Sequence, residues 1–83
     1  MIVKYFSWVR DLAETSEEVI ELPDKVSNVE ELIDYLVSIN KRYEKIFAKK
    51  TIIKIALNKT YVDSSTKINN TDEIAFFPAV TGG

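Results

Sequence analysis

The sequence has 83 residues, a net charge of −2 and neither cysteine nor histidine. A chain of this length forms one domain with a small core, which leaves little room for a catalytic cleft. Without those two residue types, the chain has no disulfide, thiolate metal site or thiol nucleophile, and no imidazole to shuttle protons near neutral pH. Its apolar runs are too short for a membrane span or a signal peptide, so we expect a soluble, cytoplasmic protein with no membrane partner.

The charges are unevenly distributed along the chain. Nine of the 13 acidic residues lie between residues 11 and 34. The middle of the chain is basic and contains Lys41, Arg42, Lys45, Lys49, Lys50 and Lys54. A basic cluster in a chain without overall positive charge is typical of a solvated face, so we expect no nucleic-acid partner. A docking patch for an acidic protein is the alternative.

Two candidate strands open the chain. Residues 2–9 and 18–22 are rich in β-branched and aromatic side chains, a composition that predicts two strands, and we expect them to pair. Residues 9–14 are predicted to form a short helical turn between them. Pro23 is expected to end the second strand, because proline cannot donate a hydrogen bond to a sheet.

One amphipathic helix is predicted next. Ser27 and Glu30 have the spacing of a capping box, in which each side chain accepts a backbone N–H at the start of a helix. The apolar residues that follow recur with the spacing of one helix face: Val29, Leu32, Ile33, Leu36 and Val37. Asn40 is the predicted end of this helix, and residues 43–47 predict a further helical turn.

The remaining chain predicts three strands. Residues 52–57 and 60–62 flank Asn58 and Lys59, which suit a two-residue hairpin because asparagine tolerates left-handed backbone. Residues 73–77 predict the last strand, which is expected to end where Pro78 removes the next donor. The order β-β-α-β-β-β indicates an α+β protein with a mixed sheet packed on one main helix.

The two glycines of the chain are its last two residues, Gly82 and Gly83. At an average glycine usage of about 7%, a Gly-Gly ending arises by chance in roughly 0.5% of chains. A terminal glycine presents a carboxylate with no side chain beside it, which can enter a narrow active site on another protein. The ending therefore predicts a reactive terminus, with an ordinary frayed end or a cloning remnant as the alternative.

Three motifs accompany this ending. They are Phe76-Phe77-Pro78-Ala79-Val80-Thr81 before the glycines, Val9-Arg10-Asp11-Leu12 after the first strand, and Asn58-Lys59-Thr60-Tyr61-Val62 at the hairpin. Together with the order of elements they resemble the small, sulfur-carrying subunit of molybdopterin synthase, a family with the β-grasp or ubiquitin-like fold. The resemblance covers the whole chain. Ala79 departs from it, since that family typically has a second proline there.

The resemblance implies a β-grasp domain over residues 1–77 and a flexible tail over residues 78–83. It further implies that an activating enzyme uses ATP and magnesium to adenylate Gly83, which a sulfur donor then converts to a thiocarboxylate. The tail would enter the large synthase subunit and give its sulfur to a pterin precursor of the molybdenum cofactor. The tail residues before Gly83 are Pro78, Ala79, Val80, Thr81 and Gly82. The chain itself would hold no cofactor or metal, and its partners would supply the catalytic groups.

Three aromatic residues are candidates for the partner interface. Phe6, Tyr61 and Phe77 fall on three different predicted strands, and aromatic residues on strands more often belong to a core. The resemblance instead implies that they form an exposed apolar patch where the small subunit meets its partners. Trp8 and Tyr5 receive no assignment from the sequence.

Other functions remain open at this stage. A sulfur carrier of thiamine synthesis also has the β-grasp fold and a Gly-Gly ending. A ubiquitin-like protein modifier would use the same activated Gly83 to form an isopeptide bond with a lysine of a target. An unrelated binding module with a fortuitous tail is the last alternative, and the sequence does not distinguish molybdenum from tungsten in the final cofactor.

Overall fold

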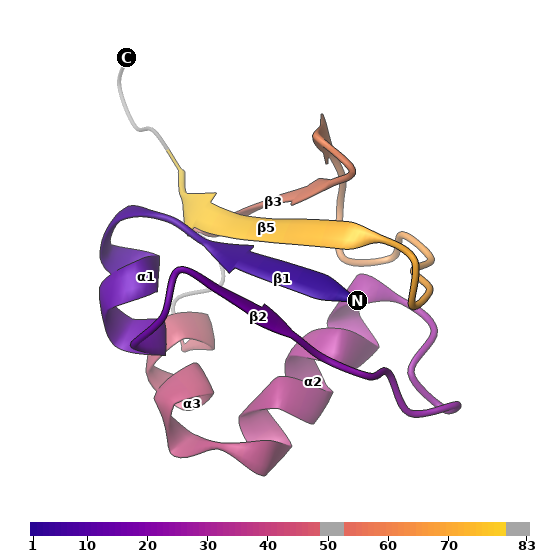
Figure 1. Cartoon of the computed structure of the whole chain (residues 1–83), viewed down its shortest axis with the longest axis horizontal. Helices are drawn as coiled ribbons and strands as arrows, with labels where there is room; N and C mark the ends of the chain where they lie inside the picture. Colours follow the sequence, from indigo (N-terminus) through magenta and orange to yellow (C-terminus); the bar gives the residue numbers. More distant parts are fainter. Residues whose placement is uncertain (49–52, 80–83) are drawn as a thin grey trace.

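The structure is a computed structural model that describes residues 1–48 and 53–79. One five-stranded sheet, in the order β2-β1-β5-β3-β4, packs on one face against helices (Figure 1). In chain order the elements are β1 (Ile2–Tyr5), α1 (Ser7–Ala13), β2 (Glu17–Val19), α2 (Val29–Ile39), α3 (Lys41–Phe47), β3 (Ile53–Leu57), β4 (Thr60–Tyr61) and β5 (Glu73–Pro78). The predicted α+β class and mixed sheet are confirmed.

The centre of the sheet is the parallel pair of β1 and β5. The register places Val3 beside Ile74 and Tyr5 beside Phe76, and all four side chains are buried. Successive residues of a strand point to opposite faces, so these four pack against the helices while their neighbours point away. We call the face opposite the helices the outer face. The core therefore lies on one side of the sheet only.

The first predicted strand is too long. β1 ends at Tyr5, and α1 begins at Ser7, so Trp8 and Val9 are helical rather than extended. Val9 and Ala13 are buried four residues apart, which is the spacing of a helix face. The β-branched and aromatic composition of residues 2–9 misled the prediction, because packing of one helix face overrides a local strand preference.

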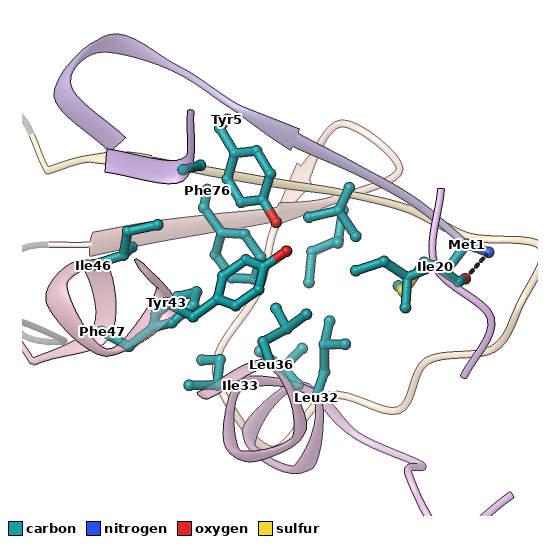
Figure 2. Close-up of a cluster of buried hydrophobic side chains, with 14 of the residues drawn as sticks. Met1, Tyr5, Ile20, Leu32, Ile33, Leu36, Tyr43, Ile46, Phe47 and Phe76 are labelled. Carbon is teal, nitrogen blue, oxygen red and sulfur yellow. Dashed lines mark hydrogen bonds between the residues drawn. The ribbon is translucent and has the colours of Figure 1, made fainter. Parts of the chain in front are cut away.

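The second strand is also shorter than predicted, although it pairs with β1 as expected. β2 covers only Glu17–Val19, while Ile20 and Leu22 are buried beyond its end. Ile20 still exchanges two backbone hydrogen bonds of 2.8 Å with Met1, one of which Figure 2 shows. The strand thus ends well before Pro23, which is not its stop.

The N-cap of α2 lies one residue later than predicted, at Asn28 instead of Ser27. The helix begins at Val29, and its N-cap is Asn28, whose side chain accepts the Glu31 N–H at 2.8 Å. The Glu31 carboxylate accepts the backbone N–H and the hydroxyl of Ser27, both at 2.8 Å. These hydrogen bonds lower the pKa of Glu31. Ser27 and Glu30 do not form the predicted capping box. The helix begins at Val29, and the position of its first residue determines which side chains reach the free N–H groups.

α2 is the longest of the three helices in the described residues, and the two predicted helical turns are the short helices α1 and α3. Asn40 ends α2 as predicted, and it also caps α3 by accepting the Arg42 N–H at 3.0 Å. α3 buries Tyr43, Ile46 and Phe47, so the predicted extra turn is a packed helix. α1 and α3 together close the part of the core that α2 does not reach (Figure 1).

The hairpin of β3 and β4 is confirmed. Asn58 and Lys59 have φ angles of 50° and 70°, the left-handed backbone that a two-residue turn requires. Ile52, the predicted first residue of this strand, lies outside the described residues. β4 ends at Tyr61 rather than at residue 62, and β5 runs to Pro78, one residue past its predicted end.

A polar clamp joins β2 to α3 beside the core. The Tyr43 hydroxyl donates a hydrogen bond to the Glu18 carboxylate, and Arg42 donates to the same carboxylate at 2.9 Å. Arg42 also donates to the Tyr43 oxygen at 2.9 Å and lies over its ring. The Tyr5 and Tyr43 hydroxyls point toward one another in Figure 2, and burial raises the pKa of both. Tyr43 is therefore a neutral donor that holds an edge strand to a helix.

We predict that Tyr43→Phe lowers the free energy of unfolding by about 1–3 kcal/mol, because the ring stays packed while Glu18 loses a buried donor. Urea unfolding followed by circular dichroism measures the change. Tyr61→Phe is the matched control, since Tyr61 is exposed and its loss of a hydroxyl should stay within about 0.5 kcal/mol. Equal effects of the two substitutions would contradict a role for the clamp.

Candidate functional site

Three aromatic rings meet on the outer face of the sheet. The ring centroids of Phe6 and Phe77 are 6.4 Å apart, and those of Tyr61 and Phe77 are 5.7 Å apart. Phe6 is 47% exposed and Tyr61 is 72% exposed, while Phe77 between them is partly buried. We call these three residues the aromatic cluster. The structure thus brings together all three predicted interface residues, and none of them belongs to the core.

The strands explain how each ring reaches this position. Phe76 points into the core, so Phe77 must point to the outer face. Phe6 follows β1, and its N–H donates to the Phe76 oxygen at 3.1 Å, which holds it beside the end of β5. The tight hairpin places Tyr61 opposite Ala56 on β3. Three segments distant in sequence therefore present one apolar surface.

Small side chains lie beside this cluster. The register places Ala75 of β5 between Lys4 of β1 and Ala56 of β3. Alanine is short, so the rings stand above this part of the sheet rather than being covered by larger neighbours. Aromatic rings that project beside short side chains form a surface that a partner protein can cover.

The tail leaves the sheet beside the aromatic cluster. Pro78 is the last residue of β5 and pairs with Ile53, and Ala79 follows it. The other predicted tail residues, Val80, Thr81, Gly82 and Gly83, lie outside the described residues. Because Pro78 directly follows Phe77, the point where the chain leaves the sheet lies next to the aromatic cluster.

No catalytic constellation is present in residues 1–48 and 53–79. These residues contain no group of three or more side chains able to hold a metal ion. The groups with shifted pKa values serve the fold: Tyr5, Tyr43 and Arg42 belong to the polar clamp or its surroundings, and Glu31 caps α2. Hydrogen bonds from Ser65 lower the pKa of Asp63 within its own turn.

The predicted basic cluster is divided by the fold. Lys41, Arg42 and Lys45 lie on α3, where Arg42 is engaged by Glu18. Lys54 lies on β3 and is exposed, whereas Lys49 and Lys50 lie outside the described residues. The two unassigned aromatics are also placed: Tyr5 is buried in the core and Trp8 packs partly against it. No continuous basic face follows from the described positions.

Sequence reasoning missed the position of Lys54. The register sets it directly opposite Phe77, on the outer face and at the tail end of the sheet. The alternation of Ile53 with Lys54 indicated which face of the sheet Lys54 occupies, but only the pairing of β3 with β5 shows that its neighbour is Phe77. The aromatic cluster therefore has a cation beside it.

Comparison with known proteins shows the family of the chain. The sequence profile of the ThiS family matches residues 3–83. The chain belongs to the ThiS family. A molybdopterin synthase sulfur carrier subunit from Haemophilus influenzae is 31% identical over 81 residues, covering 98% of this chain and 96% of that protein. The predicted family is therefore confirmed.

Solved structures show the same fold. A putative molybdopterin converting factor subunit 1 from Pyrococcus furiosus is 35% identical and covers 95% of each chain, with a TM-score of 0.74. The small archaeal modifier protein 1 from Methanosarcina acetivorans is 27% identical and covers 99% of this chain and 94% of its own, with a TM-score of 0.66. The ThiS-family chain thus has the predicted β-grasp, ubiquitin-like fold. No helix among its described residues is long and apolar enough to cross a membrane.

We predict that Phe76→Ser and Phe77→Ser have opposite outcomes although the residues are adjacent. Phe76 is fully buried, so its loss should cost about 3–5 kcal/mol or more and largely unfold so small a domain. Phe77 contributes mainly its contacts with Phe6 and Tyr61, worth about 1 kcal/mol. Thermal melts measure both. Unfolding of the Phe77 variant would place that ring in the core instead of on the outer face.

Proposed function

We propose that this chain carries sulfur on the Gly83 carboxylate for the synthesis of the molybdenum cofactor. The observation that carries the proposal is the aromatic cluster at the point where β5 passes into the tail, in a chain similar to a sulfur carrier subunit along 98% of its length. A carrier needs a reactive end and a surface that positions this end in other proteins. It needs no catalytic side chains.

The chemistry would proceed in two stages on the terminal carboxylate. In the first, an activating enzyme transfers AMP from ATP to the Gly83 carboxylate with release of pyrophosphate, using magnesium. A sulfur donor then displaces AMP and leaves a thiocarboxylate. In the second stage, the large subunit of molybdopterin synthase receives the tail, the sulfur bonds to a pterin precursor, and hydrolysis returns the Gly83 carboxylate. Partners supply the catalytic groups in both stages.

The composition of the tail suits this chemistry. Residues 78–83 are Pro-Ala-Val-Thr-Gly-Gly and include no lysine. An acyl-adenylate reacts with amines, so a tail without an ε-amino group avoids attack by its own side chains. The five residues that follow Pro78, if extended, reach at most about 17 Å at about 3.3 Å each, which is long enough to enter a pocket of a docked partner. Glycine at both last positions leaves no Cβ beside the reacting carbon.

The aromatic cluster would dock this chain on its partners. Interfaces concentrate their binding energy in a few aromatic anchors, and Phe6, Phe77 and Tyr61 are three such rings already held together. Their contacts with one another restrict them before binding, which reduces the entropy lost on association. The activating enzyme and the large subunit would use this surface in turn, because each must receive the same tail.

We predict that deleting Gly83, or adding one residue after it, abolishes thiocarboxylate formation while the thermal melt stays the same. The reactive carboxylate is then lost or displaced, and Gly83 follows the last strand. Intact-mass analysis after incubation with the activating enzyme, ATP, magnesium and a sulfur donor detects the exchange of sulfur for oxygen. A shortened chain that still gains this mass would refute the role of Gly83.

A protein modifier is the second candidate, favoured by the 27% identity to an archaeal modifier protein. Both functions begin with an activated terminus and differ in the acceptor. A carrier presents a nucleophilic sulfur, whereas isopeptide formation needs an electrophilic carbonyl next to an uncharged amine. A thiamine-pathway sulfur carrier would also use a thiocarboxylate, with another acceptor.

The acceptor can be identified directly. We predict that the thiocarboxylated chain, mixed with the large synthase subunit and the pterin precursor, yields dithiolene product and returns a plain carboxylate on Gly83. Mass spectrometry of both products measures this. Higher-mass conjugates in cells that need Gly83 but not the large subunit would favour the modifier instead, and sulfur transfer only to a thiazole precursor would favour the thiamine pathway.

A further inference from the structure

Lys54 lies on the outer face at the edge of the aromatic cluster. It is directly opposite Phe77 in the antiparallel pair of β3 and β5, and the next pair along these strands is Ile53 with Pro78, where the tail begins. Side chains directly opposite each other in such a pair have Cβ atoms roughly 4.5–5.5 Å apart. A partner that covers Phe77 and receives the tail must therefore pass close to the Lys54 ammonium group.

The described residues provide no counter-ion for Lys54. They contain two ion pairs, Lys4 with Glu73 at 3.4 Å and Arg42 with Glu18 at 2.9 Å. The first of these neutralises the other lysine of the outer face. Lys54 is exposed and forms no ion pair within residues 1–48 and 53–79.

The acid closest along the hairpin is engaged elsewhere. Asp63 follows β4, but one oxygen of its carboxylate, Oδ1, accepts the N–H of Ser65 at 2.9 Å and the hydroxyl of the same residue at 2.5 Å. These hydrogen bonds hold the carboxylate in its own turn, and the ammonium of Lys54 is not paired with it. Within residues 1–48 and 53–79, the cation beside the aromatic cluster therefore has no anion paired with it.

We infer that the partner surface that covers Phe77 presents a carboxylate to Lys54, so that recognition of the partner depends on charge as well as on shape. This inference rests on the proposed function and deepens it by naming an acidic group on the large synthase subunit. An ammonium that loses water on docking without an anion costs free energy, whereas the long lysine stem can bring it to a carboxylate at the rim. Charges at a rim act mainly on the association rate and on the choice of partner.

Protection of a sheet edge is a competing explanation for Lys54. β4 pairs only with Ala56 and Leu57 of β3. Ile53 and Lys54, at the start of β3, therefore have no residue of β4 paired with them. Lysine is common at such positions because its charge discourages pairing with other chains. A residue with this role alone would affect aggregation but not the binding of a partner that covers Phe77.

The experiment measures association of the full-length chain with the large molybdopterin synthase subunit from the same organism by stopped flow at low and high salt. The variants are Lys54→Glu, Lys54→Ala and Lys54→Arg, with Phe77→Ser to test the docking face itself. Lys25→Glu is the matched control, because Lys25 is an exposed lysine in the segment between β2 and α2. This segment lies away from the end of β5 where the tail begins (Figure 1). Thermal melts confirm that each variant is folded.

We expect Lys54→Glu to slow association about tenfold at low salt, with Lys54→Ala affected less and Lys54→Arg close to the parent. Salt should shrink these differences, because it screens rim charges. Lys25→Glu should match the parent, and Phe77→Ser should weaken binding about 30-fold.

Several results would overturn the inference. If Phe77→Ser weakens binding but Lys54→Glu behaves like Lys25→Glu, the docking face stands and the acidic contact does not. If Lys54→Ala and Lys54→Glu slow association equally and independently of salt, the effect comes from packing of the lysine stem and not from an acidic contact. If the parent does not bind the large subunit, or Phe77→Ser binds as the parent does, the proposed function fails together with the inference.

Discussion

The parallel pairing of β1 with β5 is the constraint on which the rest of the structure depends. It joins the first strand to the last, and its register sets which side chains face the helices. Val3, Tyr5, Ile74 and Phe76 lie on the inner side and are buried. A shift of one residue would exchange the two faces, moving Phe77 into the core and Phe76 to the surface. The same pairing thus forms the core and exposes the candidate docking face.

The two faces of the sheet have separate roles. On the inner side, fully burying a large apolar residue contributes about 1.5–3 kcal/mol, and the stacked rings of Tyr5 and Phe76 add to this contribution. The polar clamp of Glu18, Arg42 and Tyr43 attaches the edge strand β2 to α3. No helix of the described residues covers the outer face, and the aromatic cluster on it is separate from the core.

A reactive terminus and a docking face are sufficient for a carrier. The described residues contain no group of metal ligands, and the shifted pKa values belong to capping, turn and clamp interactions. Under the proposed function, the chemistry would take place at Gly83, and specificity would come from the surfaces that accept the aromatic cluster and the charge of Lys54. Relatives of the chain include a sulfur carrier subunit and a modifier protein, so the fold alone does not specify the reaction.

The sequence by itself determined the elements that depend on local patterns. The apolar stripe of α2, its end at Asn40, the Asn58-Lys59 hairpin and the last strand are all where local periodicity and turn chemistry predict them. The ending of the chain and its motifs also predicted the family correctly. What the tertiary structure alone decided is where distant segments meet. The end of β1, the helix α1 and the meeting of Phe6, Tyr61, Phe77 and Lys54 all depend on pairing between strands far apart in sequence. Local composition cannot reveal these contacts, because the register between distant strands is set by burying one face of the whole sheet at once.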